Sequence, residues 1–376
     1  MTNRLLIFCS VLITCCTPKP QNSKTAEGSV NNTTVSSASV IPQMPYDSTR
    51  NPFGVLTNTI GGGGPLSPQI RVKLATELGV PYMRTGTMIT KWTGSSPAND
   101  VVVKAGFKMV MNINNSPLGG GLPPSPFPTD MVAYRKSISE IMDKYPAEVI
   151  VIENEEANDK YYTGNADQYL TMLSTAIEVA HSKGLRITNG GITSRELSVL
   201  VWKDYMKKGM TKEATAWGKA CIPANFLSDL PDFSHNTAMR DRLVEIEKLL
   251  AAYKTMPLDY VNFHWYEPIN LRFVKTFPAD ADLNHVVAGA MEAVVNYLHN
   301  ATGKPIMTNE FGPVTSSPTL MTELMQEALN LKLPYAMLYS GDGDRIGATV
   351  PSHNNDGTLT PNGIAFRDFI KSHFKQ

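Results

Sequence analysis

Eight short apolar runs recur along the body of this chain, and stretches with apolar residues at helical spacing lie between them. The apolar runs occupy residues 53–57, 81–84, 108–113, 148–153, 186–189, 260–264, 305–309 and 335–339. The clearest helical patterns cover residues 68–78, 131–145, 167–183, 285–300 and 319–331. Strands that alternate with helices indicate a parallel sheet of the α/β class. Eight such units predict a closed (β/α)8 TIM barrel, whose reactive side chains lie at the carboxyl ends of the strands.

Two segments are longer than a minimal barrel requires. Residues 116–129 are crowded with Gly and Pro, and residues 205–255 form a long insertion between strands five and six with a predicted helix at 239–253. Because both segments follow strand ends, we expect them near the barrel mouth, where loops shape a binding site. The alternative fold, an open doubly wound sheet, predicts a phosphate-binding turn after strand one. Gly61 to Gly64 follow that strand but lack the GxGxxG spacing.

The N-terminus has the pattern of an export signal. Arg4 precedes a short apolar run at 5–13, which fits the core of a signal peptide and is too short to span a bilayer. The residues that follow resemble a bacterial lipobox, in which the cysteine is lipidated, and either Cys15 or Cys16 fits that position. We therefore expect a lipoprotein-type signal peptide at 1–16 and a protein anchored in the bacterial cell envelope. The alternative is a plain signal peptide with incidental cysteines, which predicts a secreted protein.

The rest of the chain divides into a tether and a folded body. Residues 17–48 are rich in Ser, Thr, Asn and Pro and predict a flexible tether, and the barrel is expected over 49–376. The formal net charge is +0, so electrostatics gives no reason to expect nucleic acid as a partner, and membrane contact is expected only through the anchor. Cys221 is the lone cysteine of the body, which excludes a disulfide within it. The sequence leaves the oligomeric state open.

Carboxylates stand at the ends of two strands that face each other across the expected barrel. Strand four is followed by Asn154 and Glu155, and strand seven is followed by Glu310, Phe311 and Gly312. Cleavage of a glycosidic bond commonly needs one carboxylic acid, which protonates the leaving oxygen, and a second carboxylate across the sugar. The pattern therefore predicts a glycoside hydrolase with a carbohydrate substrate.

The same motifs resemble the clan A glycoside hydrolases, the superfamily of many cellulases, mannanases and β-xylosidases. The resemblance covers the whole expected barrel and implies that Glu155 is the acid/base and Glu310 the nucleophile of a retaining double displacement. It implies that Asn154 binds the sugar 2-hydroxyl. Arg84 on strand two matches the clan arginine that supports the nucleophile.

Further positions extend this resemblance. His264 and Tyr266 match the His-x-Tyr of strand six, whose Tyr hydrogen-bonds the nucleophile. A polar residue usually ends strand three, and either Asn112 or Asn114 takes that place. Strand eight usually ends in a Trp that forms the floor of the site. Here Tyr339 takes that place, or the floor comes from another segment.

Each of these side chains also has a plainer interpretation. Glu153 and Glu155 should point the same way by strand alternation, and Glu153, which is deeper, fits a buried support better than an acid. Glu310 could be a structural strand-end carboxylate, and His264 could be a satisfied interior histidine. Trp92, Trp202 and Trp217 fit packing at least as well as sugar stacking.

Other function classes lack the residues that they need. The seven His form no His-x-His on a strand and no His-Glu-x-x-His, so we expect no metal, and no other cofactor is implied. Lys108 and Lys304 lie at strand starts, on the wrong face for a Schiff base. The remaining rival is a barrel that has lost its activity and acts as a surface glycan-binding or adhesion protein. Such a protein would typically lack one of the two glutamates, and both are present.

Overall fold

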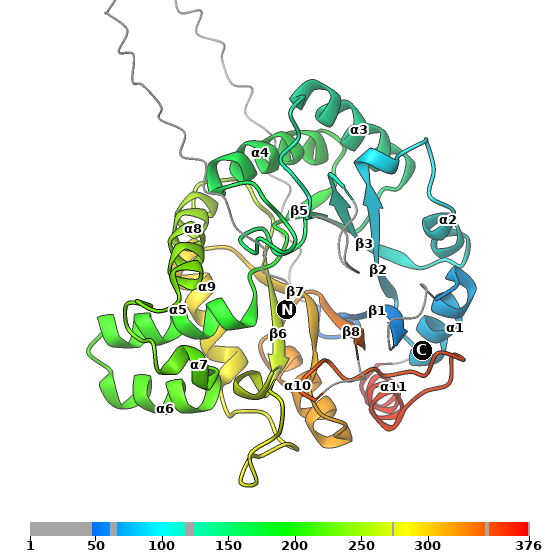
Figure 1. Ribbon diagram of the computed structural model, residues 1–376. Coiled ribbons are helices and arrows are strands. Elements are labelled where there is room, and N and C mark those ends of the chain that lie inside the picture. The colour runs from blue at the N-terminus through cyan, green and yellow to red at the C-terminus, as the bar shows by residue number, and fades with distance from the viewer. Residues whose placement is uncertain (1–46, 61–65, 117–123, 273, 343–345, 375–376) are drawn as a thin grey trace, which may run out of the picture. The chain divides into compact units, whose positions relative to one another are not determined.

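The computed structural model describes residues 47–60, 66–116, 124–272, 274–342 and 346–374, all within the compact unit Ala38–Gln376. Its eight strands form one sheet in the order β5-β4-β3-β2-β1-β8-β7-β6, and every neighbouring pair is parallel. The strands are β1 (Phe53–Ile60), β2 (Tyr82–Met88), β3 (Lys108–Asn114), β4 (Val149–Ile152), β5 (Arg186–Thr188), β6 (Val261–Glu267), β7 (Ile306–Pro313) and β8 (Ala336–Asp342). The sheet curls into a barrel with the helices outside it (Figure 1). The predicted TIM barrel is confirmed.

Polar side chains close the barrel between β5 and β6. Thr188 donates its hydroxyl to the Tyr260 carbonyl at 3.0 Å. The Asn189 side chain accepts from the Asn262 backbone N–H at 2.7 Å and donates to the Asn262 carbonyl at 3.1 Å. Beyond them Ile192 and Phe263 form one parallel bridge. Side-chain hydrogen bonds therefore join β5 to β6, where the described residues form no regular backbone ladder.

The helices are α1 (Pro68–Leu78), α2 (Pro97–Lys104), α3 (Met131–Lys144), α4 (Ala166–Ser182), α5 (Ser194–Lys207), α6 (Thr211–Cys221), α7 (Ala224–Leu227), α8 (Thr237–Tyr253), α9 (Ala290–Thr302), α10 (Pro318–Asn330) and α11 (Pro361–His373). Four of them begin at a Ser-Pro or Thr-Pro pair, whose hydroxyl caps a backbone N–H of the first turn while Pro supplies a helical φ. The predicted 205–255 insertion contains α6, α7 and α8. The predicted helix at 285–300 begins only at Ala290, because Gly289 before it has φ 72°.

Apolar side chains fill both the barrel interior and the layer between strands and helices. A separate interior cluster joins residues that lie on six of the strands or just before them: Tyr82, Val110, Val149, Val151, Tyr260, Met307, Tyr335 and Met337. Gly54 on β1 is required here, because a Cβ would lie 2.3 Å from the Met337 sulfur. This packing fixes the strands whose far ends carry the polar residues.

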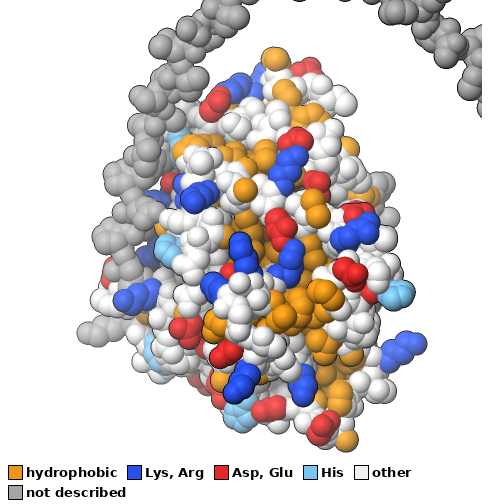
Figure 2. Space-filling model, turned by 90° about the vertical axis from the view of Figure 1, so that its left-hand side faces the viewer, with side chains coloured by type: hydrophobic (Ala, Val, Ile, Leu, Met, Phe, Trp, Pro, Cys, Tyr) orange, Lys and Arg blue, Asp and Glu red, His pale blue; other side chains and the backbone are white. Residues whose placement is uncertain are grey.

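Charged side chains of both signs are interspersed on the surface over α5 to α9, which Figure 2 shows. None of the helices in the described part of the chain is long and apolar enough to cross a membrane. The predicted signal peptide at 1–16, the tether up to residue 46 and Gly61 to Gly64 lie outside the described residues.

Candidate active site

The end of β4 turns sharply and separates its carboxylates. The strand stops at Ile152, and Glu153 and Glu155 both adopt left-handed backbone conformations, with φ 61° and 47°. The expectation that these two side chains point the same way was therefore wrong, because strand alternation ends before them. Glu153 is fully buried and accepts from the Asn115 backbone N–H at 2.7 Å and the Ser125 hydroxyl at 3.0 Å. It supports the loop after β3, and burial raises its pKa to about 8.

Glu155 faces the opposite direction, toward β6. Its Oε1 lies 3.0 Å from Nδ1 of His264, and its Oε2 accepts from Nδ2 of Asn158 at 2.6 Å. The Tyr161 hydroxyl also lies in its field: the nearby Glu155 charge, together with burial, raises the pKa of Tyr161. Glu155 is 9% exposed, so it is shielded by its neighbours and still reaches solvent.

Glu310 lies on β7 and is held by donors on both oxygens. The Arg84 guanidinium donates to Oε1, and the Tyr266 hydroxyl donates to Oε2. Burial acts to raise the pKa of Glu310, but the positive charges of His264 and Arg84 and the two hydrogen bonds outweigh it and lower the pKa to about 2. The groups around Glu310 therefore favour its ionised form.

Arg84 is fixed by two amides besides Glu310. The Nε of Arg84 donates to Oδ1 of Asn112 at 3.0 Å, and its Nη2 donates to Oδ1 of Asn154 at 2.8 Å. Because the Asn154 oxygen faces Arg84, its NH₂ group is the part that can donate to a sugar hydroxyl. Of the two amides weighed for the end of strand three, Asn112 lies beside Arg84, whereas the Asn114 side chain lies near Glu153 and acts to lower the pKa of that carboxyl.

His264 lies between the two carboxylates. Its Nδ1 is 3.0 Å from Glu155 and 3.4 Å from Glu310, and its Nε2 is 2.9 Å from Oδ1 of Asn309. Gly191 makes room for the ring, since a Cβ there would lie 2.3 Å from Nε2. The Asn309 oxygen already accepts from Asn262, so Nε2 must carry a hydrogen. Nδ1 is then the atom that shares a proton with the carboxylates.

One ligand atom from each of Glu155, His264 and Glu310 lies within 4.8 Å of the other two. Among the described residues these three form the one group of such side chains that could hold a metal ion. Arg84 and Tyr266 already donate to Glu310, and the guanidinium charge would repel a cation. The arrangement suits proton transfer and nucleophilic attack better than metal binding.

Tyr339 on β8 lies beside Tyr266 at the same end of the barrel. Its ring is half-buried and lies edge-on to Tyr266, with ring centroids 6.2 Å apart. The structure thus brings together Glu155, Glu310, Arg84, Asn154, His264, Tyr266 and Tyr339, and places Asn114 with Glu153 instead.

Three residues of the site were not anticipated from the sequence: Asn158 and Tyr161 beside Glu155, and Arg272, whose guanidinium lies 3.7 Å from the Tyr266 ring centroid. Asn158 and Tyr161 lie in the loop between β4 and α4, and Arg272 follows the short 3₁₀ helix η2 (Ile269–Leu271). A loop position carries no periodic signal, so only the spatial arrangement identifies them.

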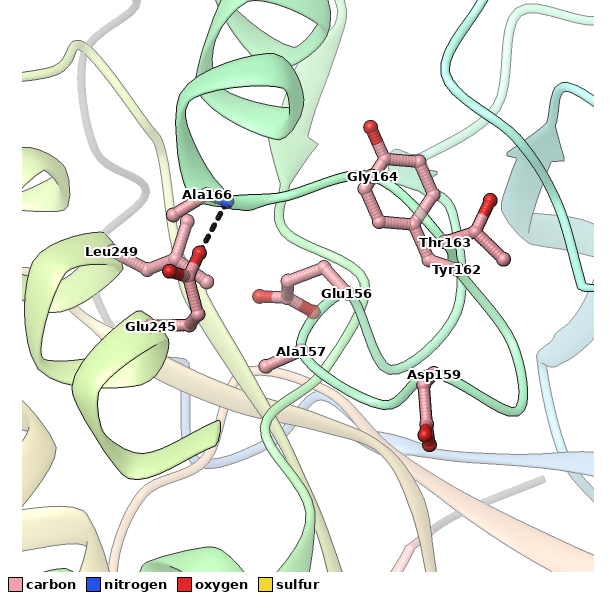
Figure 3. Close-up of a pocket in the computed structure, with 9 residues that line it drawn as sticks. All are labelled: Glu156, Ala157, Asp159, Tyr162, Thr163, Gly164, Ala166, Glu245 and Leu249. Atoms are coloured by element: carbon pink, nitrogen blue, oxygen red, sulfur yellow. Dashed lines mark hydrogen bonds between the residues drawn. The ribbon is translucent and has the colours of Figure 1, made fainter. Parts of the chain in front are cut away.

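A separate cavity of about 260 Å³ lies behind the β4–α4 loop, against α8 (Figure 3). Glu156 and Glu245 point into it from opposite sides, and Glu245 accepts from the Ala166 N–H at the start of α4. Neither Glu155 nor Glu310 lines this cavity. Glu156 is tied to Asn189 and Tyr253, at 2.7 Å each, so this third glutamate of the loop has a packing role.

The tryptophans weighed as sugar-stacking candidates pack within the protein. The Trp217 indole donates to the Ser198 carbonyl at 2.6 Å, and Trp202 packs against the core from α5. Trp92 lies edge-on to Tyr145, with ring centroids 6.0 Å apart.

No protein-family model matches the chain, and no curated protein matches it. Solved structures that are similar to this chain include glycoside hydrolases. A GH128 (subgroup II) endo-β-1,3-glucanase from Sorangium cellulosum is 14% identical, with a TM-score of 0.49 over 84% of this chain and 98% of that one. A triple mutant of an endo-β-1,4-glucanase from Xanthomonas axonopodis pv. citri is 8% identical, with a TM-score of 0.49 over 85% and 99%.

A GH5 family lichenase from Caldicellulosiruptor sp. F32 is 10% identical, with a TM-score of 0.47 over 84% of this chain and 92% of that one. At such identities and TM-scores the likeness does not extend to activity or substrate. Both have to be inferred from the site itself, and the chain is not placed in a family.

Proposed function

We propose that this protein is a retaining glycoside hydrolase, with Glu155 as acid/base and Glu310 as nucleophile. The observation that carries the proposal is the facing pair of carboxylates from β4 and β7, which have oxygens within 4.8 Å of each other. Retaining enzymes hold their carboxyl groups about 5 to 5.5 Å apart, whereas inverting enzymes leave about 6.5 to 9.5 Å for a water molecule. The close approach favours direct attack by Glu310.

The contacts of each carboxylate fit its proposed role. Arg84 and Tyr266 keep Glu310 ionised and aim it, so it can attack the anomeric carbon. Glu155 gives its proton to the leaving oxygen as the glycosidic bond breaks, and the sugar becomes an ester of Glu310. Glu155 then takes a proton from water, which attacks the anomeric carbon and releases Glu310.

The remaining side chains would position the sugar. The Asn154 amide can donate to the 2-hydroxyl, whose hydrogen bonds strengthen in the transition state of such reactions. Tyr339 offers a half-buried aromatic ring next to Tyr266, and the face of such a ring suits the apolar face of a sugar. Tyr339 thus takes the place of the strand-eight Trp that the resemblance leads one to expect.

The direct test is covalent trapping. The protein is screened against β-linked glucans, mannans and xylans and the matching aryl glycosides. A 2-deoxy-2-fluoro aryl glycoside of an active sugar is then expected to add one glycosyl mass to the peptide that contains Glu310. Labelling of another residue, or inverted product, contradicts the assignment. If the wild-type protein binds these glycans but cleaves none, the inactive glycan-binding barrel is the better description.

We also propose that the protein is exported and lipid-anchored through Cys15 or Cys16. The short apolar run at 5–13 and the lipobox-like residues after it support this. Mass spectrometry of the mature N-terminus from a bacterial host is expected to find an acylated Cys15 or Cys16. A free N-terminus beyond residue 16 would instead indicate a plain signal peptide.

A further inference from the structure

Asn158 is tied to Glu155 more closely than any residue that the resemblance identifies. Its Nδ2 lies 2.6 Å from Glu155 Oε2, and the side chain is buried, with 6% of the residue exposed. The orientation of the amide follows from its other end: Oδ1 accepts from the Lys160 backbone N–H at 3.2 Å. Because an N–H can only donate, Oδ1 must face Lys160 and the NH₂ group must face Glu155.

The backbone of Asn158 closes a turn around the same glutamate. Its N–H donates to the Glu155 carbonyl at 2.7 Å, and its own carbonyl accepts from the N–H groups of Tyr161 and Tyr162 at 2.8 and 3.0 Å. Glu155 itself has φ 47°, a conformation that a glutamate adopts only when its surroundings impose it. Asn158 supplies that constraint from both its backbone and its side chain.

The two oxygens of Glu155 therefore have different partners. Oε1 faces Nδ1 of His264, which can either donate or accept a proton, whereas Oε2 faces an amide that only donates. A donated hydrogen bond favours the carboxylate form, which Glu155 reaches when its proton passes to the leaving oxygen. Loss of Asn158 would leave the Glu155 carboxyl held through its contact with His264, about which it could rotate.

We propose that Asn158 is a positioning residue that orients Glu155 and stabilises the negative charge that forms on it when the leaving group takes the proton. The inference rests on the proposed function for its kinetic consequence, and on geometry alone for the orientation of Glu155. Asn158 acts through Glu155 and need not touch the sugar.

The kinetic test compares leaving groups. Aryl glycosides of strongly acidic phenols depart without a proton, whereas those of weakly acidic phenols need one. N158A is expected to lose roughly 10- to 100-fold in kcat/KM for weakly acidic phenols, the range for a lost hydrogen bond to a charged group, and much less for strongly acidic ones. The loss should fall on the step that breaks the glycosidic bond, with little change in the affinity for a competitive inhibitor.

Two further variants separate positioning from general damage. N158D keeps the shape but replaces the donor with an acceptor, so it should fail to rescue N158A. N99A removes an equally buried Asn, on α2, whose amide donates to the Thr87 hydroxyl at 2.9 Å away from the site. N99A should lose stability without any dependence on the leaving group. Equal losses for all phenols in N158A, or full activity in N158D, overturn the proposal.

Crystal structures of the wild-type protein and N158A test the orientation independently of activity. Glu155 is expected in one orientation in the wild-type protein and in another, or in several, in N158A, with Glu310 unmoved. An unchanged Glu155 in N158A overturns the proposal whether or not the protein cleaves any glycoside. A displaced Glu155 in a protein that cleaves no glycoside would leave the positioning role intact and remove the proposed function instead.

Discussion

Both ends of the barrel carry an arginine, a tyrosine and a glutamate in contact, and the charge balance differs between them. At the amino end Glu148 accepts from the Tyr335 hydroxyl at 2.8 Å and has three cations within 4 Å, namely Arg50, Lys108 and Arg186. At the carboxyl end two glutamates, 155 and 310, share one histidine, and one arginine contacts Glu310.

The difference separates a stabilising network from a reactive one. At the amino end the three cations and the Tyr335 hydroxyl link Glu148 to residues near the starts of several strands, so this network holds the strands together. In the proposed mechanism Glu155 exchanges a proton with the substrate while Glu310 stays ionised, and His264 contacts both carboxylates. This division is typical of barrel enzymes, in which the amino ends of the strands serve stability and the carboxyl ends carry the reactive side chains.

The largest effect is expected from Glu310→Gln. The amide keeps the shape but cannot attack the anomeric carbon, so kcat should fall by roughly 10⁴-fold or more. The matched change at the other end, Glu148→Gln, should leave kcat unchanged. Initial rates on an active glycan measure both variants. If both variants lost activity to the same degree, the carboxyl end would not be the reactive end of the barrel.

Arg84→Met against Arg50→Met tests the two arginines. Loss of the Arg84 charge should raise the pKa of Glu310, so the carboxylate is lost at higher pH as the solution is acidified. The acid limb of the pH profile of kcat/KM should therefore move upward, with a loss of roughly 10²- to 10³-fold at the optimum.

Arg50→Met should keep activity and its pH profile, but its hydrogen bonds to the hydroxyls of Tyr82 and Tyr335 are lost. The free energy of unfolding should fall by about 1 to 3 kcal/mol. An acid limb that stays in place in Arg84→Met would contradict the role of Arg84 in keeping Glu310 ionised.

Tyr266→Phe against Tyr335→Phe gives a smaller contrast. Tyr266 donates to Glu310, so its loss should lower kcat/KM by roughly 10-fold, the value of one hydrogen bond. Tyr335 donates to Glu148, and its loss should reduce only the thermal stability. Kinetics and thermal unfolding of both variants decide this, and equal kinetic losses would argue against it.

The smallest effect on activity is expected from a change at the buried carboxyl of Glu153, whose ionisation affects the stability of the fold. Its pKa is raised from 4.5 to about 8 in the folded protein, so the folded state holds a proton that the unfolded chain gives up earlier. This contribution to stability is complete below about pH 4.5 and is lost as the pH rises toward 8. Glu153→Gln should weaken the fall in stability over that range, as measured by denaturant unfolding at several pH values. An unchanged slope in the variant would mean that other groups set it.

The sequence by itself determined the order of the elements and the two proposed catalytic glutamates. The spacing of apolar residues shows which positions are buried, and it therefore predicts the strands and helices. The carboxyl ends of parallel strands lie at one face of a barrel, which places Glu155 and Glu310 at the same face. Arg84, His264 and Tyr266 were expected from the resemblance to the clan A glycoside hydrolases, and they lie on β2 and β6.

Only the tertiary structure decided what happens after a strand ends. The left-handed conformations of Glu153 and Glu155 turn the two side chains apart, and they are imposed by contacts with Asn115, Ser125 and Asn158 rather than by their own preferences. The same holds for Tyr161 and Arg272, which reach the site from loops. A loop side chain is directed by its contacts in the folded protein, so its place cannot be calculated from a period.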